Sequence, residues 1–131
     1  MNPITKMSNT TNTRTQYTSG LAGESEAERY LISLGYTPIT RRYRGGDGEI
    51  DLILRDGDTL VFVEVKARPR GAAGQGLLAV TPAKQRRMTH AARRFLLERD
   101  ALDSPVRFDV VEITAGGLLH VKDAFRPMRA W

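Results

Sequence analysis

The chain has 131 residues, 40% of them hydrophobic and 27% charged, which fits one globular domain and excludes fibrous and fully disordered classes. Lys and Arg outnumber Asp and Glu by 20 to 15, and the net charge of +5 favours a polyanionic partner. The absence of cysteine excludes disulfides, thiolate zinc sites and cysteine nucleophiles. Without a membrane-length apolar run or a secretory signal, we predict a cytoplasmic protein that does not enter membranes.

The N-terminal segment predicts a tail followed by a helix. Residues 1–18 are polar and show no periodicity, so we expect a disordered tail, with a single domain over residues 19–131. From Gly20 onward, Ala27, Leu31 and Leu34 recur at helical spacing. Gly35 is well placed to end this helix in a left-handed conformation.

Three extended stretches follow the first helix. They cover residues 36–40, 49–55 and 59–66, and are separated by two turn signals, Gly45-Gly46 and Asp56-Gly57-Asp58. We therefore predict a three-stranded meander. The next stretch, residues 68–76, is rich in glycine and arginine and predicts an exposed loop.

A second helix and two further strands complete the domain. Thr81 can cap the helix with Pro82 in its first position, and an apolar stripe runs along it through Met88, Ala91, Ala92 and Phe95. Residues 106–114 and 118–122 are the last strands. The order α-β-β-β-α-β-β predicts an α/β fold, in which the third strand, the second helix and the fourth strand form a parallel crossover.

Alternation along the second and third strands predicts a clustered site. If the turn between them has an even number of residues, Asp51 lies opposite Glu64. The packing face is then wholly apolar, with Ile50, Leu52, Leu54, Val61, Val63 and Val65. The other face gathers Glu49, Asp51, Glu64 and Lys66 at one end.

This cluster has the composition of a metal-dependent phosphoesterase site. Two carboxylates across a ladder have Cβ atoms about 4.5–5.5 Å apart and repel unless a cation compensates. Oxygen ligands suit Mg²⁺ or Mn²⁺. Lys66 can orient the attacking water or neutralise charge on a phosphate. Glu24, on the apolar stripe of the first helix, is a further candidate ligand, and Glu28 could substitute for it.

Basic residues near this cluster predict contacts to a phosphate backbone. The candidates are Arg44, Arg68, Lys84, Arg87 and Arg94. Two alternatives remain open at this point: the arginines form an ordinary solvated helix face, and Glu49 and Lys66 form a cross-strand ion pair beside solvated acids.

The motifs just described resemble those of the YraN family, bacterial proteins related to Holliday-junction resolvases. The resemblance covers about residues 20–125, and its specific parts are Gly23-Glu24, residues 48–53, residues 61–68, Lys84-Gln85 and residues 107–111. It implies a restriction-endonuclease-like PD-(D/E)xK core with a mixed central sheet flanked by helices. Asp51 and Glu64 would be metal ligands, Lys66 the catalytic lysine and Glu24 the additional helix acid. Many relatives carry an asparagine where this chain has Arg42.

Three functions are compatible with these residues. We expect a Mg²⁺- or Mn²⁺-dependent nuclease acting on DNA, with branched DNA as one candidate substrate. The first alternative is a module that binds nucleic acid without cleaving it, and the second is an interaction scaffold that binds no nucleic acid. Resolvases of similar fold cut as dimers, which suggests a homodimer by analogy.

Overall fold

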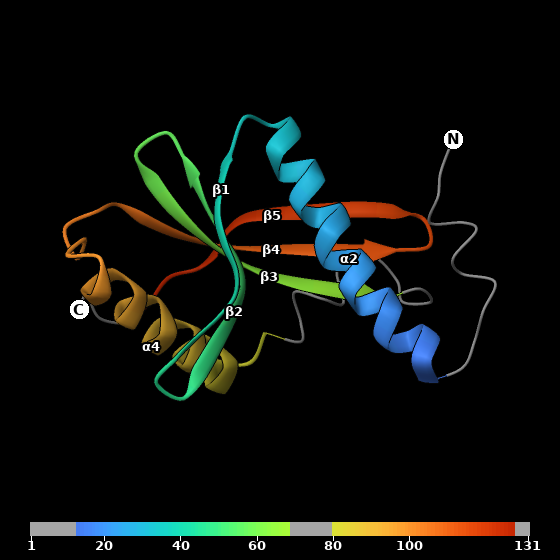
Figure 1. The fold of residues 1–131 in the computed structure, drawn as a ribbon, viewed down its shortest axis with the longest axis horizontal. Coiled ribbons are helices and arrows are strands. Elements are labelled where there is room, and N and C mark those ends of the chain that lie inside the picture. Colours follow the sequence, from blue (N-terminus) through green and yellow to red (C-terminus); the bar gives the residue numbers. More distant parts are fainter. Residues whose placement is uncertain (1–12, 69–79, 128–131) are drawn as a thin grey trace.

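The computed structural model describes residues 13–68 and 80–127, with side chains from residue 22. The elements run in the predicted order along these residues (Figure 1): α2 (Thr13–Ser33), β1 (Thr37–Gly45), β2 (Gly48–Asp56), β3 (Thr59–Arg68), α4 (Pro82–Glu98), β4 (Val106–Thr114) and β5 (Gly117–Phe125). The described part of the chain is thus one five-stranded sheet with two helices. The α/β class and the element order predicted from the sequence are confirmed.

The sheet is mixed, and its strand order follows the chain from β1 to β5. The strands β1, β2 and β3 form an antiparallel meander, β3 and β4 are parallel, and β4 and β5 are antiparallel. Parallel neighbours need a long crossover, and α4 lies within it. The predicted cap of α4 is confirmed, because the Thr81 side chain accepts a hydrogen bond from the backbone N–H of Lys84.

Element boundaries differ from the predictions mainly at the N-terminus. The helix α2 begins at Thr13 rather than near Gly20, and it ends before Gly35, whose φ of +96° confirms the predicted left-handed conformation. Residues 13–18 of the predicted tail belong to α2, so the tail was predicted too long; residues 1–12 lie outside the described residues, and a tail there stays a prediction. The predicted loop over residues 68–76 likewise lies outside the description, except for Arg68.

Both faces of the sheet are covered by a helix. Along β3, Phe62 packs in the cluster beneath α4 with Phe95, whereas Val61 and Val63 pack in the cluster beneath α2 with Leu31. Successive residues of a strand point to opposite faces, so α2 and α4 cover opposite faces of the sheet. A strand buried on both sides explains why residues 60–65 are apolar apart from Glu64.

One residue of the predicted packing face was placed wrongly. The predicted parity is confirmed where Leu52 pairs with Val63, but Ile50 packs beneath α4 with Ile53 instead of joining Leu52 beneath α2. The β2–β3 ladder ends at the Leu52–Val63 pair, whereas β2 continues to pair with β1. The alternation inferred from the β2–β3 ladder therefore does not extend to Ile50.

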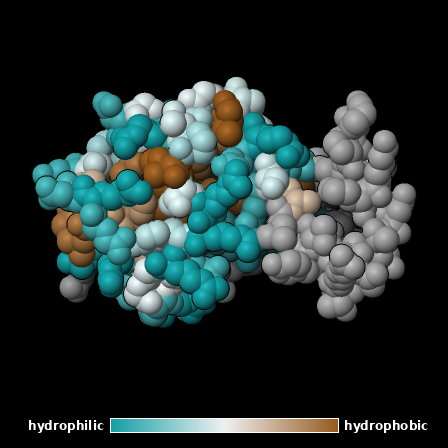
Figure 2. Space-filling view, in the orientation of Figure 1, coloured by the Kyte–Doolittle hydropathy of each residue, from teal (hydrophilic) through white to brown (hydrophobic). Residues whose placement is uncertain are grey.

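The surface in view is largely hydrophilic (Figure 2). Hydrophobic colour appears in separate patches, one at the upper end of α2 and others to the left of it. The half-exposed residues Ile32 and Leu34 lie at the C-terminal end of α2 and just beyond it. Across residues 13–68 and 80–127, neither helix has the length and hydropathy needed to cross a bilayer.

Candidate functional site

Asp51 lies where β2 separates from β3. Its Oδ2 accepts a 2.8 Å hydrogen bond from the backbone N–H of Val65, so the carboxylate replaces a ladder partner at this point. Burial and the neighbouring Glu64 carboxylate raise the pKa of Asp51 to about 7, against the lowering effect of the Val65 hydrogen bond. The predicted ladder pair of Asp51 with Glu64 is not formed, because the ladder ends at Leu52–Val63, but Glu64 lies close enough to Asp51 to act on its pKa.

Glu64 is held by two lysines from different elements. Its side chain is 4% exposed, and its Oε2 lies 3.1 Å from Nζ of Lys66 and 3.3 Å from Nζ of Lys84. Lys66 comes from the same strand, and Lys84 comes from the first turn of α4. The helix thus adds a second cation to the predicted cluster. The alternative ion pair between Glu49 and Lys66 is not formed, because Glu49 pairs with Arg44 at 3.6 Å.

The helix α2 brings Glu24 to the same region. Its negative charge contributes to the raised pKa of Asp51, while its Oε1 accepts a 3.0 Å hydrogen bond from Nε of Arg42. Glu28, the predicted substitute, is engaged elsewhere in a 2.8 Å ion pair with Arg41. Of these two candidate acids, Glu24 is therefore the one that approaches Asp51.

The donor set fits a divalent cation held by few protein ligands. Nowhere in the described residues do three Asp, Glu or His side chains come together as a complete metal site. Mg²⁺ commonly takes one or two carboxylates and keeps other positions for water and phosphate. Asp51 and Glu64 supply such a pair. Burial is the main cause of the raised pKa of Asp51, and the charges of Glu64 and Glu24, which a divalent cation would compensate, raise it further.

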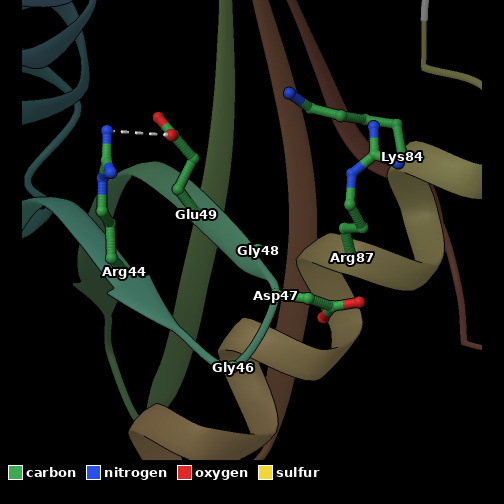
Figure 3. A pocket seen from close by; sticks show the side chains of 7 residues that line it. All are labelled: Arg44, Gly46, Asp47, Gly48, Glu49, Lys84 and Arg87. Carbon is green, nitrogen blue, oxygen red and sulfur yellow. Dashed lines mark ion pairs between the residues drawn. The ribbon is translucent and has the colours of Figure 1, made fainter.

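The predicted basic residues divide into two groups. Arg44, Lys84 and Arg87 line an open pocket of about 380 Å³ between the β1–β2 turn and α4 (Figure 3). Arg94 instead pairs with Glu98 on its own helix at 3.3 Å and does not line the pocket. Arg68 ends β3, and its buried Nε has no hydrogen-bond partner within the described residues. The structure thus brings only three of the five to one pocket.

Sequence reasoning missed one acid near the cluster. Glu112 of β4 is 1% exposed, and its Cα pairs with that of Lys66 across the parallel ladder. Residues in register share a face, so Glu112 lies on the same face as Lys66. The available signal was an acid directly among the apolar residues Val110, Val111 and Ile113, since such groups are rarely buried without a partner.

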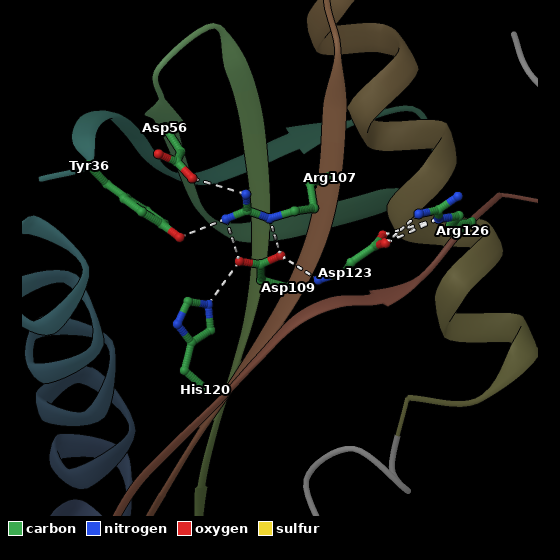
Figure 4. Close-up of polar contacts among 7 residues, drawn as sticks. All are labelled: Tyr36, Asp56, Arg107, Asp109, His120, Asp123 and Arg126. Carbon is green, nitrogen blue, oxygen red and sulfur yellow. Dashed lines mark hydrogen bonds and ion pairs between the residues drawn. The ribbon is translucent and has the colours of Figure 1, made fainter. Parts of the chain in front are cut away.

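A second buried polar cluster lies on the α2 side of the sheet (Figure 4). Asp109 is fully buried and accepts hydrogen bonds from the Arg107 guanidinium at 2.9 and 3.0 Å and from the Asp123 backbone N–H at 3.0 Å. Its Oδ2 also lies 2.8 Å from Nε2 of His120. Arg107 extends the cluster to Asp56 and Tyr36. These contacts tie β4 to β5 and to the start of β1, so the cluster is structural.

The family model and the relatives that match this chain all carry the same family description. The family described as "Uncharacterised protein family UPF0102" matches residues 23–113. A UPF0102 protein of Saccharophagus degradans is 44% identical over 108 residues, covering 82% of this chain and 92% of the relative. Another, from Geobacter sulfurreducens, is 45% identical over 111 residues, covering 81% and 87%. A third, from Symbiobacterium thermophilum, is 47% identical over 97 residues, covering 74% and 82%. The chain therefore belongs to the UPF0102 family, which is the YraN family that its motifs resemble.

Proposed function

We propose that this protein is a Mg²⁺- or Mn²⁺-dependent nuclease that hydrolyses phosphodiester bonds in DNA. The observation that carries the proposal is the convergence of Asp51 with Glu64 and its two lysines, since Lys84 also lines the basic pocket. Acids that can hold a divalent cation thereby adjoin cations that can hold a phosphate. The five-stranded mixed sheet, with a helix before it and a helix in its crossover, supports a restriction-endonuclease-like core.

Each residue has a definite part in this reaction. Asp51 and Glu64 would hold the cation, which when bound withdraws charge from the phosphate and makes water more acidic. Lys66 would orient the attacking water and stabilise charge that develops on the phosphate. Water attacks phosphorus and one P–O ester bond breaks, leaving a phosphate on one product and a hydroxyl on the other. Glu24 would add negative charge beside Asp51.

The test is a cleavage assay with matched variants. Single-stranded, duplex and branched DNA are incubated with the protein in Mg²⁺, in Mn²⁺ or in EDTA. We expect metal-dependent cleavage that falls at least about 100-fold in Asp51→Ala and Lys66→Ala, the range of a lost catalytic group. Lys122→Ala, an exposed change on β5, is the control and should cleave like wild type. Equal cleavage by all four proteins would show contamination and refute the proposal.

One observation favours a second function, binding without cleavage. Lys66 and Lys84 both form ion pairs with Glu64, which gives the buried acid a structural role of its own. Under this alternative the basic pocket binds nucleic acid and the acids only support the fold. DNA binding that is insensitive to EDTA, weakens steeply with salt and leads to no cleavage of any substrate would favour it. Cytoplasmic location and a homodimer remain proposals beside either function.

A further inference from the structure

The pocket between the β1–β2 turn and α4 has two walls from distant parts of the chain. Arg44 and Glu49 flank the turn on one wall, and Lys84 and Arg87 rise from α4 on the other (Figure 3). The floor is the turn itself, residues 46–48. An open cavity of about 380 Å³ admits a small polar group rather than a whole duplex.

Two contacts fix the turn against α4. A Cβ atom on Gly48 would collide with the backbone carbonyl of Arg87, so the strand can approach the helix this closely only because residue 48 is glycine. Beside it, Oδ1 of Asp47 lies 3.1 Å from Nδ1 of His90. The turn is therefore docked on the helix at two points, which makes the pocket preorganised for a ligand.

The charges in the pocket suit a phosphate. Arg87 forms no ion pair with any carboxylate of the described residues, and it lies close enough to Asp47 to help lower the pKa of that acid, after the larger effect of His90. Arg44 is paired with Glu49 at 3.6 Å, but these side chains are 83% and 50% exposed. Exposed pairs contribute little, so a phosphate oxygen can replace Glu49 as the partner of Arg44.

Lys84 connects the pocket with the acid cluster, because it lines the pocket and lies 3.3 Å from Glu64. Along β2, Glu49 lines the pocket and Asp51 belongs to the cluster, two residues apart. A strand that presents one phosphate to the acids would therefore place a neighbouring phosphate in the pocket. We propose that the pocket is a subsite for that neighbouring phosphate, held by Arg87 and Arg44. This inference rests on the proposed nuclease function, and it assigns the pocket to a phosphodiester strand.

The first test measures binding without catalysis. A fluorescein-labelled single-stranded oligonucleotide is titrated with the protein in EDTA, and the dissociation constant is measured at several salt concentrations. Arg87→Ala should weaken binding about tenfold, and it should reduce the slope of log affinity against log salt by about 0.7, as expected for one lost phosphate contact with a single strand. Arg93→Ala removes the same charge from an exposed position of α4 that does not line the pocket, so it is the matched control. Equal weakening by the two variants would overturn the subsite.

A second variant should act in the opposite direction. Glu49→Gln removes the acid that competes for Arg44, so we expect binding about threefold tighter than wild type. Weaker binding by this variant would contradict the proposal, because it would mean that Glu49 itself supports the ligand. A fold defect is not a concern here, because the side chain is half exposed.

Free inorganic phosphate carries the same anionic group as a DNA strand, so it is tested as an alternative ligand of the pocket. Its binding is measured by calorimetry with wild type and Arg87→Ala at constant ionic strength. Phosphate that binds through Arg87 while the oligonucleotide does not bind would overturn the assignment to a strand. Binding is measured in EDTA and cleavage in Mg²⁺, so the two proposals can fail separately. Arg87-dependent binding without cleavage by wild type would refute only the nuclease. Cleavage together with binding that does not depend on Arg87 would refute only the subsite.

Discussion

The backbone N–H of Val65 donates a 2.8 Å hydrogen bond to Oδ2 of Asp51 at the place where β2 and β3 separate. The side chain of Asp51 therefore satisfies a main-chain donor that would otherwise lose its partner at the end of the ladder. This bond keeps the carboxylate of Asp51 beside Glu64 even though the two acids repel one another. The repulsion between the two carboxylates destabilises the folded state when both are ionised, and this destabilisation can be measured as a pH dependence of stability.

Replacement of Asp51 by asparagine should change how stability depends on pH. The pKa of Asp51 is raised to about 7 by burial and by Glu64, whereas in the unfolded chain it is about 3.9. The folded state therefore binds this proton more tightly, so wild type loses stability as pH rises from about 4 to about 7. Asparagine does not titrate and can still accept the hydrogen bond from Val65. We expect the free energy of unfolding of Asp51→Asn, relative to wild type, to be higher at pH 8 than at pH 5.

Urea denaturation at the two pH values, without divalent metal, checks this expectation. Asp58→Asn in the exposed β2–β3 turn is the control, and its difference from wild type should not follow the same course. Added Mg²⁺ should stabilise wild type at pH 8 more than Asp51→Asn, because a bound cation favours the ionised acid. A pH-independent difference between Asp51→Asn and wild type would show that Asp51 is already ionised at pH 5.

The two lysines that hold Glu64 should behave cooperatively. Both ammonium groups contact the same oxygen, Oε2, so either Lys66→Met or Lys84→Met leaves the buried acid one cation. We expect each single change to cost about 1 kcal/mol. The double variant should lose more stability than the sum of the single variants, because a buried carboxylate left without a partner destabilises the fold by about 3–5 kcal/mol. Urea denaturation of the four proteins forms the double-mutant cycle, with Lys122→Met as the control, and additive costs would contradict the shared role.

Local sequence patterns predicted the register of the β2–β3 pair, but not where that pairing ends or which helix residues contact the sheet. The pairs Leu52–Val63 and Leu54–Val61 follow from turn length and alternation alone. The same reasoning is wrong for Ile50, because alternation assumes that the two strands remain paired. The contact between Lys84 and Glu64 depends on how α4 packs on the sheet. Helical spacing places Lys84 and Arg94 equally on the surface, so only the tertiary structure separates their roles.

A departure from the family pattern has a backbone explanation. At position 42 the resemblance implies an asparagine, and the Arg42 found there has a φ of +50°. Asparagine is enriched in this left-handed region, whereas longer side chains are uncommon there. The nearby register shift between Pro38 and Thr40 shows that β1 is irregular over this stretch. Backbone geometry alone therefore favours an asparagine at position 42, a cause that sequence reasoning without coordinates could not weigh against a catalytic role.

Loss of Asp109 should destabilise the fold without removing the proposed chemistry. Asp109→Ala leaves Arg107 and His120 without their common buried acceptor, which should cost about 3–5 kcal/mol. Asp123→Ala, which removes an exposed pair with Arg126, should cost less than about 1 kcal/mol. Thermal denaturation measures both. Cleavage per folded molecule at low temperature should match wild type, and a specific loss of cleavage would show that the cluster contributes to the reaction.

The contribution of Asp109 to stability should be lost at low pH. Although burial raises the pKa of Asp109, hydrogen bonds from His120 and Arg107 hold it below its ordinary value. A group whose folded pKa is depressed stabilises the fold above its unfolded pKa, and this contribution is lost as pH falls through the folded value. Asp109→Asn should therefore lose less stability than wild type between pH 5 and pH 2. Equal losses, measured by urea denaturation at both pH values, would contradict the assignment.

Gly48 should be intolerant of any side chain. A Cβ atom at this position meets the backbone carbonyl of Arg87, which cannot move without displacing α4, so Gly48→Ala must separate the β1–β2 turn from the helix. We expect a destabilisation of about 1–3 kcal/mol, the usual cost of overpacking, and weaker oligonucleotide binding from the disturbed pocket. Gly116→Ala is the matched control, because its Cβ would meet only the Thr114 hydroxyl at 3.8 Å. If thermal denaturation gives the two variants equal stability, the close packing of the turn on α4 does not exist in solution.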